Sequence, residues 1–247
     1  MKRIFLFLSF LFLFLFNFSR AEDNTNTYRK TQIGFTISPD LCYRKLTNGF
    51  SYRYDLEKPK LGYTLGASVW WQLRKKIGLE LGLSYSNKGY KFKFNDFSFL
   101  TYGDFIDPTK GFVFNTGPTA DVKGKYVYNF SYIEVPFKLT FLAGTKSLHF
   151  FYSVGVAPGF LFYSSTKSIV SIDGEEPNVT KNATPFNGIP INISPLLSIG
   201  INYNINDKSN LRIEPLVKYG LIDISGAATS GEFLWSAGLS ISCFFIK

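Results

Sequence analysis

Few side chains in this sequence are suited to nucleophilic or acid–base catalysis. The chain has a single histidine, His149, and two cysteines, Cys42 and Cys243. Hydrolases and acyltransferases need a nucleophile activated by a neighbouring base, and a third group that orients that base. The sequence places no serine and carboxylate beside His149. We therefore expect a packing role for this histidine and no enzymatic activity.

Carboxylates and bases are instead spaced through segments that are otherwise apolar or small. They take the small, polar phase of an alternating pattern, so we expect them on one face of a sheet. Buried charge is costly unless it is paired and hydrogen-bonded. A structural network of four acids and four bases is therefore the prediction, and a polar conduit is the alternative. The residues are Asp40, Arg44, Glu80, Glu134, Lys138, Arg212, Glu214 and Lys218.

Within this set, the expected partner of Lys138 is Glu80. Both residues lie a few positions from a short turn, on strands that we expect to be neighbours. Glu134 and Lys138 lie four positions apart on one strand, which is too far for direct contact.

The sequence offers no metal or cofactor site. It has no cluster of cysteines and histidines, and "DGEE" (173–176) lacks the ligand spacing of a calcium loop. Cys42 and Cys243 are expected at opposite ends and on opposite faces of neighbouring strands, so they cannot form a disulfide. The formal net charge is +9, but the basic residues are dispersed in an exported chain. We therefore expect no nucleic-acid partner.

Eight segments carry the alternation that positions these residues. In "INISPLLSIGINYNI" (191–205), large apolar residues take every odd position and mostly small or polar ones the even positions. A period of two indicates a β-strand, because successive side chains point to opposite faces. The segments are 32–44, 61–73, 77–86, 131–143, 148–163, 191–205, 211–221 and 233–245.

The composition of the two faces indicates which one meets lipid. A water-facing sheet face is usually rich in charged residues and threonine, whereas here the second face is dominated by glycine, serine, alanine and asparagine. Small residues suit the narrow interior of an eight-stranded barrel, which is filled by side chains. The predicted fold is therefore all-β: a closed, eight-stranded, antiparallel, up-and-down transmembrane β-barrel with its apolar faces in lipid.

The connections alternate in length. Those at 74–76, 144–147 and 206–210 are short, and those at 46–60, 95–125, 164–190 and 222–231 are longer. Outer-membrane barrels have this asymmetry, with short periplasmic turns and long extracellular loops. At "NKG" (87–89) the alternation changes phase, which predicts a β-bulge at the barrel rim.

The longest connection, 95–125, is unusually aromatic. We expect its aromatic side chains to pack in an extended hairpin or over the lumen; the alternative is a surface that docks another protein. The residues are Phe97, Phe99, Tyr102, Phe105, Phe112 and Phe114.

The N-terminus has the pattern of an export signal. Lys2 and Arg3 precede an apolar run from Ile4 to Phe16, and small residues follow at the cleavage positions near Ala21. We expect residues 1–21 to be a cleaved signal peptide, 22–30 a short periplasmic segment and 31–247 a single barrel domain in the bacterial outer membrane.

Three stretches resemble a known family. "LGLSYSNKGYKFK" (81–93), "YIEVPFKL" (132–139) and "LRIEPLVKYGLIDI" (211–224) are similar to recurring segments of the small bacterial outer-membrane β-barrel family that includes PorT-like proteins. The resemblance implies the barrel fold, an outer-membrane location and an accessory role in secretion.

Together these features predict a closed, monomeric barrel with a structural or interaction role in the cell envelope. Its expected partners are outer-membrane lipid and another envelope or secretion protein, contacted through the extracellular loops. Two alternatives remain at this point. One is a small-solute porin or channel, and the other is a soluble, lipocalin-like carrier in which the apolar faces point inward.

Overall fold

The computed structural model describes most of the chain after residue 30. The described residues are 31–47, 56–74, 76–94, 105–106, 113–114, 122–143, 148–172, 176–183, 186, 188–206, 208–225 and 231–246. The expected signal peptide (1–21), the segment 22–30 and the aromatic residues Phe97, Phe99, Tyr102 and Phe112 lie outside them. In this part of the chain, no helix is long and apolar enough to cross a membrane.

The described residues form β-strands almost throughout. Their bounds are β1 Thr31–Thr47, β2 Glu57–Arg74, β3 Ile77–Phe94, β4 Phe105–Ile106, β5 Val113–Phe114, β6 Val122–Glu134, β7 Phe137–Ala143, β8 Leu148–Ile172, β9 Asn178–Ala183, β10 Ile191–Asn206, β11 Ser209–Tyr219 and β12 Gly231–Ile246.

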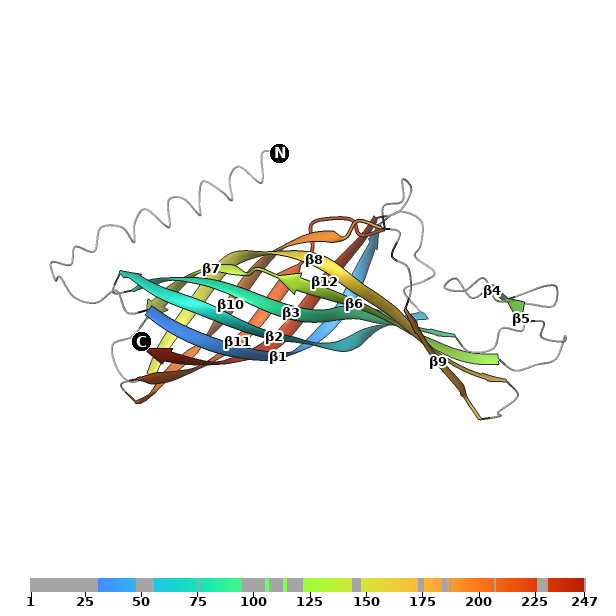
Figure 1. Ribbon diagram of the computed structural model, residues 1–247, viewed down its shortest axis with the longest axis horizontal. Coiled ribbons are helices and arrows are strands. Elements are labelled where there is room, and N and C mark those ends of the chain that lie inside the picture. Colours follow the sequence, from blue (N-terminus) through green and yellow to red (C-terminus); the bar gives the residue numbers. More distant parts are fainter. Residues whose placement is uncertain are drawn as a thin grey trace.

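The strands close into a ring of eight antiparallel positions (Figure 1). The order is β1, β2, β3, β6 with β7, β8, β10, β11 and β12, and the pairing of β12 with β1 closes the ring. β6 and β7 occupy one position, since both pair with β3 on one side and β8 on the other. The prediction of a closed, eight-stranded, up-and-down barrel is confirmed.

The break between β6 and β7 comes from Pro136, which has no backbone N–H to give to the ladder. The pairing continues around it. The carbonyl of Pro136 accepts a hydrogen bond from the N–H of Gly82, and the N–H of Val135 donates to the carbonyl of Pro158, both at 2.9 Å.

The two ends of the barrel differ. β2–β3, β7–β8 and β10–β11 are joined by the three predicted short turns at one end, which we call the turn end (left in Figure 1). At the other end, the loop end, the strands run on past the ring. The prediction that 164–190 is a loop is wrong in part, because β8 continues to Ile172 and pairs there with β9. Within the predicted loop 95–125, Phe105 lies opposite Phe114 in the pair β4–β5.

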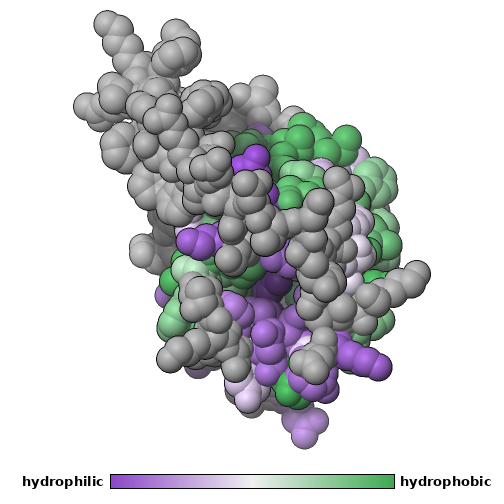
Figure 2. Space-filling view, turned by 90° about the vertical axis from the view of Figure 1, so that its left-hand side faces the viewer, coloured by the Kyte–Doolittle hydropathy of each residue, from purple (hydrophilic) through white to green (hydrophobic). Residues whose placement is uncertain are grey.

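Large apolar side chains cover the outside of the ring. Those exposed on every barrel strand include Phe35, Leu65, Leu83, Phe137, Phe160, Ile199, Val217 and Leu239. Figure 2 looks at the turn end, where hydrophobic residues lie on the outside of the barrel and hydrophilic residues occupy its middle. This distribution is the reverse of a soluble barrel and suits a lipid environment.

A charge on this apolar face should destabilise the barrel according to its depth. Ile199, in the middle of β10, is 63% exposed, and Ile205, near the turn end of the same strand, is 53% exposed. We expect Ile199→Lys to lower the free energy of unfolding by about 2–4 kcal/mol and Ile205→Lys by less than about 1 kcal/mol. Urea-driven unfolding in lipid vesicles measures both, and equal losses would contradict the lipid-facing assignment.

Candidate functional site: the lumen and the loop end

The interior nearest the turn end holds a connected set of ion pairs. The ammonium Nζ of Lys138 lies 2.9 Å from Glu80 Oε1 and 2.8 Å from Glu214 Oε1. The guanidinium Nη1 of Arg212 lies 2.8 Å from the other oxygen of Glu80. The Ser198 hydroxyl donates to the second oxygen of Glu214 at 2.8 Å. The expected pair of Glu80 with Lys138 is therefore present, on residues that face each other across β3 and β7.

Aromatic rings enclose Arg212. Its guanidinium carbon lies 4.4 Å from the ring centre of Phe244, 5.0 Å from that of Phe151 and 5.9 Å from that of Trp70. These distances allow cation–π attraction, which is strong where water is excluded. The rings fit because glycines face them: a Cβ on Gly78 would lie 2.3 Å from the Trp70 ring.

A second level of ion pairs lies closer to the loop end. Glu134 bridges two buried ammonium groups, with Lys88 Nζ at 2.5 Å and Lys218 Nζ at 2.8 Å. At the rim, Arg44 pairs with Glu57 and, at 2.6 Å, with Glu232. We call all of these paired residues together the lumen network.

Asp40 is the predicted acid whose carboxylate is held by hydroxyl groups in this structure. Its carboxylate accepts hydrogen bonds from the hydroxyl of Ser38, at 2.6 Å, and from that of Thr64. The sequence pattern does not predict four further inward charged residues: Glu57, Lys60, Lys88 and Glu232. Lys88 stands in the stretch where the alternation changes phase, which is the signal that could have found it.

The phase change at "NKG" is not a bulge in β3. The register between β3 and β6 runs without a shift from Asn87, opposite Ser131, to Lys93, opposite Lys125. The predicted bulge is present at this level, but the extra residue lies on the neighbouring strand: in the β2–β3 pair the register shifts between Pro59, opposite Tyr90, and Tyr63, opposite Asn87. What changes along β3 is the environment, because its outer face leaves lipid and enters water.

Beyond this boundary the two faces of the sheet exchange character. The inner face becomes aromatic: Tyr90 stacks on Tyr128 with ring centres 4.7 Å apart, and Phe94 stacks on Tyr126 at 5.7 Å. The Arg44 guanidinium lies 3.8 Å from the Tyr90 ring centre. The outer face becomes basic. The sequence pattern attributes the aromatic positions to a bulge, and it does not identify the basic face.

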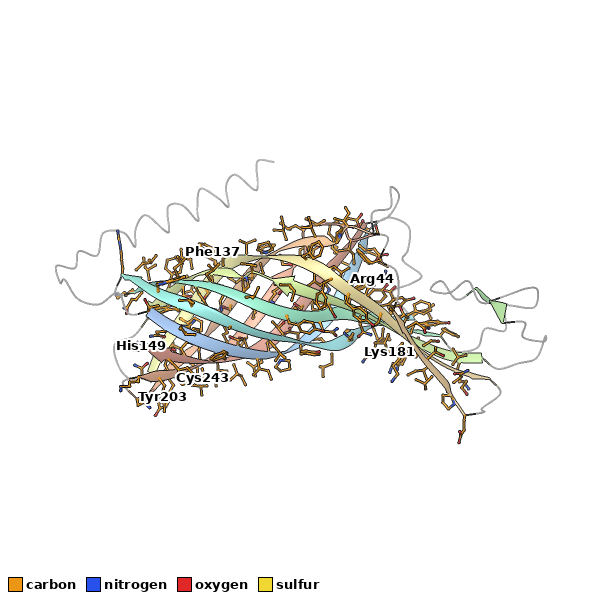
Figure 3. The ribbon with its side chains drawn as sticks, in the orientation of Figure 1. Arg44, Phe137, His149, Lys181, Tyr203 and Cys243 are labelled. Carbon is orange, nitrogen blue, oxygen red and sulfur yellow. The ribbon has the colours of Figure 1, made fainter. Side chains whose placement is uncertain are left out.

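The histidine and the two cysteines lie on three different strands, β8, β1 and β12. His149 is half-buried near the turn end, opposite Asn202 (Figure 3). Both cysteines are free: Cys42 lies opposite Ser236, whereas Cys243 lies opposite Phe35. Across the described ranges, no group of three or more histidines, cysteines and acids could hold a metal ion.

A closed antiparallel ring with an apolar exterior and a filled, charged interior defines a transmembrane β-barrel. More particularly, the chain belongs to the family described as "Outer membrane protein beta-barrel domain", whose model matches residues 51–226. This membership places it in the bacterial outer membrane, and in barrels of this membrane the short turns lie on the periplasmic side and the long loops on the outside.

Solved structures with a similar fold have low sequence identity to this chain. OprG from Pseudomonas aeruginosa is 11% identical, covers 92% of this chain and 99% of its own, and has a TM-score of 0.42. Ail of Yersinia pestis is 12% identical, with coverages of 87% and 99% and a TM-score of 0.32. The protease OmpT from Escherichia coli is 7% identical, with coverages of 92% and 99% and a TM-score of 0.37. No curated protein sequence matches significantly. With these TM-scores, the likenesses carry no argument about function.

Proposed function

We propose that the protein is a closed, non-conducting barrel that has no enzymatic activity and acts in the envelope through its extracellular end. The observation that carries this proposal is the lumen network. Glu80 on β3 and Arg212 on β11 stand on opposite walls of the ring, four positions apart in the strand order, and their charged atoms meet at 2.8 Å. An ion pair that reaches across the lumen leaves its centre occupied.

Further contacts across the lumen, one at the same level and one closer to the loop end, support the same conclusion. Lys138 on β7 reaches Glu214 on β11, and Lys218 on β11 reaches Glu134 on β6. In each pair both side chains are no more than 8% exposed. Eight strands enclose an interior that side chains can fill, whereas aqueous channels open in barrels of about 16 strands.

An interaction role follows from what remains exposed. In this proposal the extended strands at the loop end lie outside the membrane, and the resemblance to PorT-like proteins points to an accessory role in secretion. In this proposal residues 1–21 are a cleaved signal peptide, 22–30 form a short periplasmic segment, and 31–247 form one monomeric barrel domain. The proposed partners are outer-membrane lipid and another envelope or secretion protein.

Planar-bilayer recording tests the closed barrel. We expect purified, folded protein to give no steady single-channel steps, whereas a 16-stranded porin inserted under the same conditions conducts. A shift in gel mobility on boiling verifies folding before each recording. Steady steps from the folded protein would overturn the proposal and favour a small-solute channel. Recovery of the protein in the soluble periplasm without a mobility shift would favour a soluble carrier.

A further inference from the structure

The outer face of the extended sheet at the loop end carries a row of residues that is mostly lysine. Lys58 on β2 lies opposite Lys91 on β3. Lys91 lies opposite Val127 on β6, and this valine lies opposite Lys167 on β8, which in turn lies opposite Lys181 on β9. Paired residues share a face, so one row across five strands presents four lysines.

A second row lies directly beyond the first. Lys93 on β3 pairs with Lys125 on β6, followed by Ile169 on β8. Lys123 lies two residues further along β6 on the same face. We call this surface the lysine face. Its lysines are Lys58, Lys91, Lys93, Lys123, Lys125, Lys167 and Lys181. Among the described residues of these strands that point outward here, every charged one is a lysine.

The crowding of these lysines has an electrostatic consequence. Neighbouring strands lie only about 4.8 Å apart, so the ammonium groups repel one another. Partial burial, together with repulsion from Lys91, Lys93 and Lys167, lowers the pKa of Lys125. A surface of this kind attracts anions.

The position of the lysine face indicates which anions it meets. On β3, β6 and β8 it continues the lipid-facing surface of the same strands. Towards the membrane on β8, Ser165 is buried, and the next outer side chains, Tyr163 and Phe162, are both exposed. From Tyr163 to Lys167 is four residues, or about 13 Å along the strand. The lysines thus stand just above the level where aromatic residues mark the membrane surface. Figure 3 shows Lys181 on this extension.

A groove lies between the lysine face and the membrane-level surface. The groove forms where the pairing partner of β8 changes. The pairing of β8 with β10 ends at Phe160, opposite Ile191, and its pairing with β9 starts at Ser165, opposite Ala183. The groove has a volume of about 400 Å³, and Phe162, Tyr163 and Phe186 contribute to its lining. An apolar groove below a cationic surface suits a molecule that has an apolar tail and an anionic head.

We propose that the lysine face and this groove bind a phosphorylated glycolipid of the outer leaflet. The lysines bind its phosphate groups, and the groove holds part of an acyl chain. This inference rests on the proposed orientation of the barrel but not on whether the barrel conducts.

The test is binding of lipid A by the folded barrel in neutral detergent, measured by native mass spectrometry. Diphosphorylated lipid A, dephosphorylated lipid A, inorganic phosphate and a sulfated polysaccharide are compared. The test variant is Lys91→Gln/Lys125→Gln/Lys167→Gln. The matched control, Arg74→Gln/Lys76→Gln/Lys208→Gln, removes three exposed charges at the turn end.

We expect the test variant to bind diphosphorylated lipid A at least about tenfold more weakly than the native chain, and the control by less than about twofold. Removing the phosphates from lipid A should weaken its binding to the native chain as much as the three substitutions weaken binding of the diphosphorylated form. Added salt should weaken binding of diphosphorylated lipid A to the native chain. The boiling shift must persist in both variants.

Two results would overturn the inference: equal affinity of the native chain and the test variant, or binding of the polysaccharide without binding of the lipid. Binding of inorganic phosphate as tight as that of lipid A would contradict the role of the groove. A conducting barrel that still binds the lipid would overturn only the closed-barrel proposal. A closed barrel that fails to bind would overturn only this inference.

Discussion

Glu134→Gln should lower the free energy of unfolding by about 3–5 kcal/mol, because it leaves buried ammonium groups without their carboxylate. Glu134 is the carboxylate paired with both Lys88 and Lys218, and all three side chains are almost fully buried. A glutamine keeps the shape and one carbonyl acceptor but carries no charge. Guanidinium-driven unfolding in detergent or vesicles, followed by the boiling shift, measures the loss.

Two further variants separate charge from packing. Glu176→Gln changes an exposed carboxylate outside the lumen and should alter the free energy of unfolding by less than about 0.5 kcal/mol. Lys88→Met/Glu134→Gln/Lys218→Met removes both stranded ammonium groups. It should recover most of the loss, since apolar replacements of a whole buried ion-pair set are often neutral. If the triple variant is no more stable than Glu134→Gln, the loss does not come from uncompensated charge.

The sequence predicts the ring, its turn end and part of the lumen network for a single physical reason. Along each strand inside the membrane, from the short turns towards the loop end, lipid on one side and a crowded lumen on the other impose a strict period of two. The register of neighbouring strands at such turns is then constrained within a residue or so. That constraint is enough to pair Glu80 with Lys138 from the sequence alone. Pairs across the lumen, such as that of Glu80 with Arg212, depend on the closure of the ring, which periodicity does not encode.

Prediction fails where the membrane ends. Beyond Asn87 the strand keeps its register with β6, but its outer face meets water and its inner face packs aromatic rings. If every apolar position is assigned to the outer face, the alternation therefore shows a change of phase at this point of the sequence. For this reason the pattern misses Lys88 as an inward residue, and it assigns 164–172 to a loop although β8 continues through it. On β3 the period of two persists while its two faces exchange character, whereas on β8 a register shift also adds a residue between Leu161 and Tyr163.

Gly89 stands at this boundary, and Gly89→Ala should be costly. Its φ angle is +146°, a conformation that residues with a side chain rarely adopt. A Cβ there would also lie 1.9 Å from the backbone carbonyl oxygen of Tyr128, which is fixed in the ladder of β6. Strain and overpacking together should lower the free energy of unfolding by about 2–5 kcal/mol. Chemical denaturation in vesicles measures the effect.

Gly159→Ala is the matched control, since a Cβ there would meet the side chain of Glu134 at 3.1 Å and no positive φ angle is involved. Its effect should stay within about 1 kcal/mol. Hydrogen exchange shows where the damage of Gly89→Ala lies. Faster exchange at Tyr126 and Tyr128, with protection retained at Thr140, would show that the extension separates from an intact barrel. Uniform loss of protection would show instead that the ring and its extension unfold as one unit. If Gly89→Ala has the same free energy of unfolding as the native chain, the extended sheet that bears the lysine face does not depend on a positive φ angle at this position.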